Sequence, residues 1–204
     1  MMSTKNGDGI APTAKGRAAK ERIYFSAIRL IQSGGYESMT VPAICESSGV
    51  SVGAFYHHFD SKGDILLRYV RDESDRLLGL YRSMEGLSRR DALLGTVAAF
   101  FGFFDVKGRA FVSAFLGLLF SSGGTFYDPG AFSIAAILEN GLRRGFERGE
   151  FGISAVDSVP LARGIVLDLM VSWCVAADSV VAAADSLPSI ARDRMSAFLD
   201  MLRP

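Results

Sequence analysis

The segment SVGAFYHHFDSKGDIL, Ser51–Leu66, brings hydroxyl, phenol, imidazole and ammonium groups close together in an otherwise largely apolar chain. A metal site is the first chemistry to consider. His57 and His58 are adjacent, and adjacent residues on a helix point about 100° apart, so one ion cannot easily bind both. The chain contains 2 histidines in all. We therefore expect no metal site here.

Catalysis is the second chemistry to consider. A nucleophile needs an adjacent base that a third group orients. Ser51, His57 and Asp60 share a short segment, but their order in sequence does not make a triad. The chain has no GxSxG, P-loop or GxGxxG motif. We expect no catalytic residue, no cofactor and no enzyme activity.

Contact with nucleic acid fits the segment best. Small residues at Ser51–Ala54 would let a helix backbone approach a duplex closely. Tyr56, His57 and His58 carry donors suited to phosphates or base edges. Lys62 falls in the first turn of the next predicted helix, where its ammonium and free backbone N–H groups could meet one phosphate together.

Local signals predict the helices that position these groups. Thr40 and Ser51 have the residue types of N-caps, and Pro42 falls in a first turn, where its missing N–H costs little. Ser61 opens a capping box with Asp64 in the reciprocal position. Two short helices joined by a turn of three or four residues that contains glycine form a helix-turn-helix.

Composition and charge limit the classes of protein to which the chain can belong. The chain has 204 residues, 49% hydrophobic, and a formal net charge of zero. Residues 1–30 nevertheless carry six Lys or Arg against two acids, a net of +4. The 2 cysteines are far apart, so a disulfide framework is not expected. The start of the chain lacks an apolar signal segment, and the apolar runs are short or interrupted by charges, so we expect a cytoplasmic protein without membrane contact.

Helical periodicity dominates the whole chain, and strand patterns are almost missing. We predict an all-α fold. The expected helices are Ala14–Ser33, Val41–Ser47, a short one from Ser51 to about His57, one from Ser61 to about Met84, Asp91–Phe104, Arg109–Ser121, Ala131–Arg148, Ser158–Val181 and Pro188–Leu202. Gly34 and Gly35 are expected to end the first helix.

The segment TVPAICESSGVSVGAFYHHFDSKGDIL, Thr40–Leu66, resembles the helix-turn-helix signature of TetR-family transcriptional regulators. The pattern is approximately T-V-x-x-I-A-x-x-A-G-V-S-x-G-x-[LF]-Y-x-[HY]-F-x-[SN]-K-x-x-L. Cys45 and Ser48 stand where the family usually has alanine, and both are small enough to preserve close helix packing. With the preceding first helix, the resemblance extends from Ala14 to about Tyr69.

The resemblance implies a flexible tail at residues 1–13, a three-helix DNA-binding domain at residues 14–62 and a helical ligand-binding and dimerisation domain at residues 63–204. It also implies a homodimer on double-stranded DNA, with both recognition helices in the major groove of a palindromic operator. The implied DNA-binding residues are Thr40, Ser51, Val52, Gly53, Ala54, Tyr56, His57 and Lys62. Among them, Tyr56, Lys62 and Thr40 would meet phosphate, and His57 would read a base edge.

The second half is rich in phenylalanine, which suits either a plain core or an apolar pocket. The candidate pocket residues are Phe100, Phe104, Phe111, Phe115 and Trp173. By the resemblance, the last two helices would pair with their copies, and the candidate dimer residues are Leu161, Ile165, Leu169, Phe198 and Leu199.

The expected function is a ligand-responsive transcriptional regulator, a repressor released from its operator by a small apolar or aromatic effector. Two alternatives remain open at this point. One is an activator with the same fold, and the other is a helical lipid- or small-molecule-binding protein that does not bind specific DNA. Binding of duplex DNA with a steep salt dependence would separate the regulators from the latter.

Overall fold

The computed structural model describes residues 14–121, 132–152, 157–175 and 186–204, and no strand occurs in these ranges. The described elements are α1 (Ala14–Ser38), α2 (Val41–Ser48), α3 (Val52–His58), α4 (Lys62–Ser83), α5 (Arg89–Lys107), α6 (Arg109–Ser121), α7 (Ser133–Glu147), α8 (Val159–Val175) and α10 (Leu187–Asp200). The predicted all-α class is confirmed. The predicted tail lies outside the described residues.

The capping signals act as predicted. Thr40 and Ser51 each accept a hydrogen bond from the backbone N–H three residues ahead and so begin α2 and α3. Ser61 and Asp64 form a complete capping box at the start of α4. Gly49 ends α2 in the left-handed conformation, with φ 68°. Local hydrogen bonds thus set where the helices of the helix-turn-helix begin and end.

The first helix differs from its prediction at the C-terminal end. Gly35 leaves the helical conformation, with φ 74°, but helical turns resume as far as Ser38. The Ser38 hydroxyl contacts the carbonyls of Gly35 and Leu30 and holds this kinked extension in place. Glycine therefore produces a kink in α1 where the sequence predicted an end.

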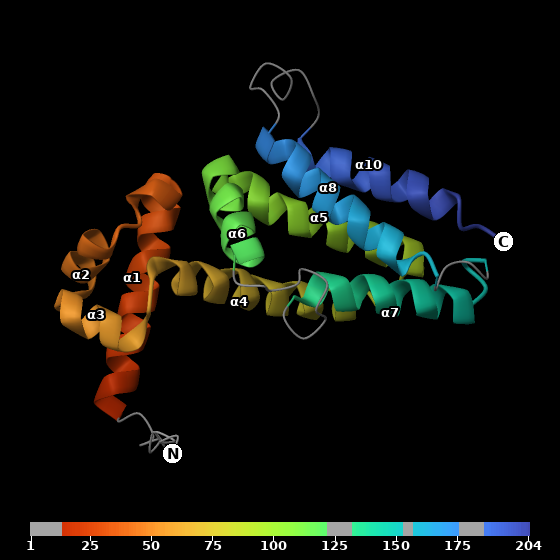
Figure 1. Ribbon diagram of the computed structural model, residues 1–204. Coiled ribbons are helices and arrows are strands. Elements are labelled where there is room, and N and C mark those ends of the chain that lie inside the picture. The colour runs from red at the N-terminus through yellow and green to blue at the C-terminus, as the bar shows by residue number, and fades with distance from the viewer. Residues whose placement is uncertain (1–13, 122–131, 153–156, 176–185) are drawn as a thin grey trace, which may run out of the picture.

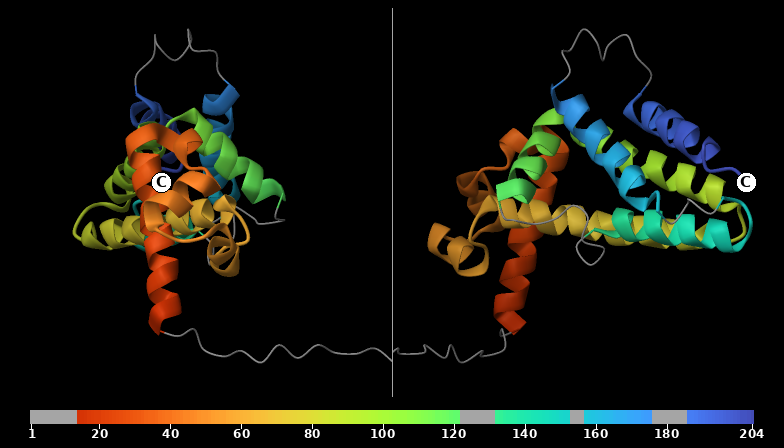
Figure 2. Two further views of the ribbon diagram at one scale, coloured as in Figure 1. Left: turned by 90° about the vertical axis from the view of Figure 1, so that its left-hand side faces the viewer. Right: turned by 45° about the vertical axis from the view of Figure 1, so that its right-hand side comes forward.

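Helices α1–α3 lie together at one end of the molecule, and α4 runs from that end along the base of the remaining helices (Figure 1). Helix α7 lies beside the far half of α4, and α8 and α10 lie on the other side of α5, as Figure 2 also shows. A continuous apolar core joins both halves. The predicted domain division at residues 62/63 coincides with the start of α4, and it stays a prediction.

The later helices match their expected ranges within a few residues, and one range is only partly described. Helix α8 covers Val159–Val175, and the remainder of the predicted range, to Val181, lies outside the described residues. Helix α10 packs along α5 and also contacts α8.

Candidate nucleic-acid interface

Helix α3 is anchored by one face and exposed on the other. Phe55 is completely buried, and Phe59, just after the helix, packs its ring 6.0 Å from the Phe55 ring. The side chains of Val52 and Tyr56 are 49% and 52% exposed, and His57 is also exposed. Exposed apolar and aromatic side chains on a helix of seven residues mark a surface suited to a partner.

Gly53 lies in the first turn of α3, and nothing inside the chain requires a glycine there. A Cβ atom at this position would meet only the Ser51 hydroxyl, at an ordinary distance of 3.9 Å, and the backbone φ is not positive. Glycine in a helix costs about 0.5–1 kcal/mol relative to alanine. The absence of a side chain leaves the backbone of this turn open to close approach by another molecule.

Thr40 and Ser51 are exposed, and both use their hydroxyl oxygen to cap a helix. A hydroxyl that accepts a backbone hydrogen bond still has its own proton to donate. Both side chains can therefore cap a helix and donate to a phosphate at the same time.

Lys62 is half-buried at the first position of α4, and its ammonium lies 4.3 Å from the centre of the Tyr36 ring. The ring, from the kinked C-terminal extension of α1, holds the cation near the start of α4. The capping box occupies the N–H groups of Asp60, Ser61 and Asp64. No described residue accepts a hydrogen bond from the Lys62 N–H, so its ammonium and N–H are both available to one anion.

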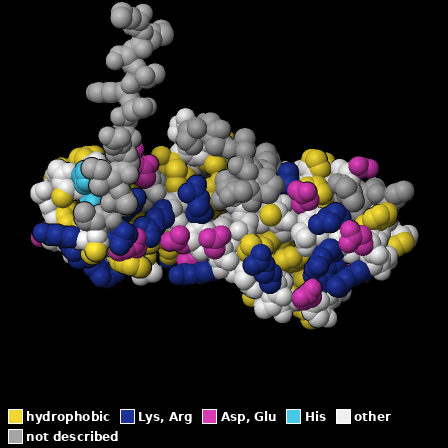
Figure 3. Space-filling model, turned by 90° about the horizontal axis from the view of Figure 1, so that it is seen from below, with side chains coloured by type: hydrophobic (Ala, Val, Ile, Leu, Met, Phe, Trp, Pro, Cys, Tyr) yellow, Lys and Arg dark blue, Asp and Glu magenta, His cyan; other side chains and the backbone are white. Residues whose placement is uncertain are grey.

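Basic side chains extend this surface along α1. Lys15, Arg17, Lys20 and Arg22 are all exposed in its first half. Figure 3 shows Lys, Arg and His side chains gathered at the left-hand end of the molecule, which holds α1–α3. His58 is less exposed than His57. Its partial burial, and then the nearby His57 and Lys20, lower the pKa of its imidazole. The surface therefore presents positive charge where the exposed face of α3 lies.

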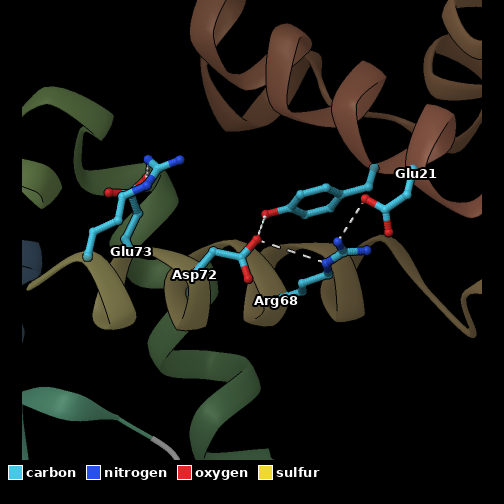
Figure 4. A network of polar contacts seen from close by, with 6 residues as sticks. Glu21, Arg68, Asp72 and Glu73 are labelled. Carbon is cyan, nitrogen blue, oxygen red and sulfur yellow. Dashed lines mark hydrogen bonds and ion pairs between the residues drawn. The ribbon is translucent and has the colours of Figure 1, made fainter. Parts of the chain in front are cut away.

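A polar network, which the sequence did not reveal, joins α1 to α4 (Figure 4). Arg68 forms a 2.9 Å ion pair with Glu21, and its guanidinium carbon lies 3.9 Å from the centre of the Tyr24 ring. The Tyr24 hydroxyl donates a hydrogen bond to Asp72. Burial, and then the Asp72 carboxylate, raise the pKa of Tyr24 far above its usual range, so this donor keeps its proton. We call these four residues the α1–α4 network.

An apolar cavity of about 290 Å³ lies between α4 and α5, close to the α1–α4 network along α4. We call it the α4–α5 cavity. Its lining residues are Val70, Glu73, Ser74, Arg76, Leu77, Leu80, Ala99, Phe100, Phe103 and Phe104. Phe100 and Phe104 thus lie where the pocket prediction placed them, in the wall of a cavity, although their role in binding stays a prediction.

The other predicted pocket residues do not line the α4–α5 cavity. Phe115 stacks on Phe104 with ring centres 5.7 Å apart, Phe111 lies 6.2 Å from the same ring, and both are completely buried. They form a second layer that supports the wall. Trp173 lies apart, with the Arg109 guanidinium 5.9 Å from its ring centre.

The predicted dimer residues fall into two groups. Leu161 is 64% exposed and Ile165 is partly exposed on α8, so both can meet a second chain. Leu169, Phe198 and Leu199 are each at most 3% exposed within a single chain. Because α10 packs along α5 and contacts α8, these three side chains are buried within their own chain, and their place at a dimer interface stays a prediction. The dimer itself stays a prediction.

Two further observations concern membrane-spanning helices and metal sites. None of the described helices combines the length and the apolar character that a bilayer crossing requires. Within the described ranges, His, Cys, Asp and Glu side chains do not gather in any group of three that could hold a metal ion.

Comparison with known proteins agrees with this geometry. A family model described as "Bacterial regulatory proteins, tetR family" matches residues 23–69, from the middle of α1 to the first turns of α4. The HTH-type transcriptional regulator UidR of Escherichia coli (strain K12) is 28% identical over 81 residues, which are 39% of this chain and 41% of UidR. The match thus takes in about two fifths of the length of that relative.

Two solved structures share the fold over most of their length. RolR in complex with the ligand resorcinol has a TM-score of 0.59 and 17% identity, covering 91% of this chain and 89% of RolR. FadR of Thermus thermophilus, described as a TetR-family transcriptional repressor in complex with lauroyl-CoA, has a TM-score of 0.60 and 18% identity, covering 88% and 92%. Residues 23–69 thus match the family model of tetR bacterial regulatory proteins, and the chain shares its all-helical fold with both solved structures.

Proposed function

We propose that this protein is a dimeric, ligand-responsive transcriptional repressor that binds a palindromic operator and is released from it by a small, apolar or aromatic effector. The exposed face of α3 carries the proposal, because it combines a glycine that the fold does not require with a fully buried anchor, Phe55, beneath it. Such a helix is rigid and allows close approach, which suits insertion into a major groove.

The proposed contacts divide into two classes. Thr40, Tyr56 and Lys62 would donate to phosphates, which position the protein without reading sequence. Val52 and Ala54 have apolar side chains that suit thymine methyl groups, and His57 would contact a base edge directly. The preferred operator sequence would then depend mainly on these three side chains.

The α4–α5 cavity supports the effector part of the proposal. Its wall is mainly aliphatic and aromatic, and Glu73, Ser74 and Arg76 supply the few polar groups that orient a ligand. The two solved relatives are described with bound resorcinol and lauroyl-CoA. A cavity of about 290 Å³ suits the smaller kind of ligand.

Helix α4 would carry the signal, because it touches both functional parts. Val70 and Glu73 line the cavity, while Arg68 and Asp72 hold α1 through the α1–α4 network. An effector that binds one position of α4 better than the other shifts the population of the two states. The separation of the two recognition helices in the dimer would change with it, and the operator would be released.

The α1–α4 network makes a prediction of its own. Tyr24→Phe removes one donor to Asp72, and we expect the free energy of unfolding to fall by about 1 kcal/mol. Urea unfolding at neutral pH measures the change, with Tyr56→Phe as the control because the Tyr56 hydroxyl is exposed. Equal stability of the Tyr24 variant and the parent protein would show that the network contributes nothing to holding α1 on α4.

The experiment that tests the proposed function is selection of genomic DNA fragments by the purified full chain, with Tyr56→Phe and Lys62→Ala in parallel. We expect enrichment of one palindrome by the parent protein and weaker binding by both variants. Lys62→Ala should lower the salt dependence of log K by about one, since one phosphate contact is lost. The neighbouring genes would then indicate the effector.

Two outcomes would change the proposal. A transcription assay on the selected palindrome should show repression, and stimulation instead would mean an activator with the same fold. Absence of any enriched sequence, with the same weak binding by the parent protein and both variants, would refute DNA recognition. That result would favour a helical protein that binds small molecules only.

A further inference from the structure

Helix α4 has a second hollow on its opposite flank, against α7. This α4–α7 cleft has a volume of about 480 Å³, within the range of about 300–1,000 Å³ typical of small-molecule sites. Its apolar surface comes mainly from Leu78 on α4 and Ile137 on α7. The cleft shares no lining residue with the α4–α5 cavity, so it is a separate site.

The charged groups of the α4–α7 cleft are mostly positive. Arg82, Arg89 and Arg144 line it together with one carboxylate, Glu85, which gives a formal charge of +2. The Arg82 backbone carbonyl accepts hydrogen bonds at the end of α4, but its guanidinium forms no ion pair or hydrogen bond with any residue that the structure describes. Figure 3 shows Lys and Arg side chains, with Asp and Glu side chains among them, around apolar surface on the right-hand half, where α7 and the far part of α4 lie.

The carboxylate in the cleft is held weakly. Glu85 pairs with Arg144 at 3.4 Å, and their side chains are 68% and 43% exposed. Exposed ion pairs of this kind contribute little to stability. An incoming anion can therefore take the place of Glu85 on Arg144 and contact Arg82 as well.

Buried positive charge adds to the field of the cleft. Arg89 is 1% exposed, and its Nη2 donates to the carbonyls of Met84, Glu85 and Leu87. These bonds hold the guanidinium at the C-terminal end of α4, but Nε has no hydrogen-bond partner. The Glu150 carboxylate accepts a hydrogen bond from the Arg89 backbone N–H, but no ion pair forms between the guanidinium and a carboxylate of the described residues. A buried guanidinium without a direct ion pair favours a nearby anion.

We propose that the α4–α7 cleft binds a small organic anion, with its carboxylate or phosphate group against Arg82 and Arg144 and its apolar body over Leu78 and Ile137. Two separated guanidinium groups suit the oxygens of either head group. The inference does not depend on DNA binding, because it rests on the contacts of the α4–α7 cleft alone.

Isothermal titration of the full chain, without DNA, tests the proposal with three probes of equal apolar length: hexanoate, hexyl phosphate and the neutral hexanamide. We expect saturable binding of at least one anion with one site per chain, and binding of hexanamide at least tenfold weaker. Comparison of the two anions identifies the preferred head group. No saturable binding of either anion at millimolar concentration, or equal binding of hexanamide, would overturn the proposal.

Variants locate the site. Arg82→Gln and Arg144→Gln should each raise the dissociation constant of the anion at least tenfold, while Glu85→Gln should leave it equal or lower. Arg143→Gln is the matched control, because Arg143 lies on α7 outside both the cleft and the α4–α5 cavity. This control should bind like the parent protein. Thermal unfolding of each variant confirms that it is folded, and unchanged affinity in the two folded cleft variants would place the anion elsewhere and refute the proposal.

Discussion

Phe55→Ala is expected to lower the free energy of unfolding by about 3–5 kcal/mol and to abolish operator binding. Phe55 is completely buried, and it is the one buried side chain of α3. Its removal leaves a cavity beneath a helix of seven residues, which is too short to be stable without packing. Urea unfolding and binding to the selected operator measure the two effects.

Tyr56→Ala is the matched comparison, because Tyr56 is the next residue of the same helix and is 52% exposed. We expect its stability to stay within about 0.5 kcal/mol of the parent protein, as for most surface changes. Operator binding should nevertheless weaken, because the phenol is a proposed phosphate contact. If both alanine variants lost the same stability, the two faces of α3 would not be divided into an anchor and a contact surface.

Gly53→Ala is expected to change stability and DNA binding in opposite directions. The folded protein should gain about 0.5–1 kcal/mol, because a helical glycine is replaced and the added Cβ meets no close atom. Operator affinity should fall by about 1–3 kcal/mol, the free energy of one good base contact, which is roughly a 5- to 150-fold loss. Thermal unfolding and a binding titration on the selected operator measure the two changes.

Gly79→Ala supplies the control for this pair of effects. Gly79 lies exposed within α4, and a Cβ there would also have no atom within 4 Å. The same gain in stability is expected with no change in operator affinity, since Gly79 is far along α4 from α3 (Figure 1). Unchanged operator affinity in Gly53→Ala, together with its gain in stability, would show that no molecule approaches α3 as closely as proposed.

The sequence alone determined the local structure of the helix-turn-helix. Thr40, Ser51 and Ser61 cap their helices as predicted, because a cap is a hydrogen bond across three residues and can be recognised in the chain order. Phe55 and Phe59 are four residues apart, a spacing at which side chains meet on one side of a helix, and both are buried. The all-α class followed from periodicity in the same way.

Only the tertiary structure decided where the second half places its aromatic side chains. Phe100, Phe104, Phe111 and Phe115 have the same chemistry and similar spacing in the chain. Two of them line the α4–α5 cavity, and the other two support its wall from behind. A helical pattern shows which residues share a face, but the helix that packs on that face determines whether a cavity remains.

Contacts between residues far apart in the sequence could not be predicted for the same reason. Tyr24 and Asp72 are 48 residues apart, and Arg144 and Glu85 are 59 apart. Leu169 and Phe198 looked suited to a partner chain, but the packing of α8 and α10 buries both within one chain. Caps and helical periodicity depend on residues within about one turn of each other, so the sequence alone shows them. Cavities, long-range ion pairs and interfaces depend on how separate helices pack in space, so they require the tertiary structure.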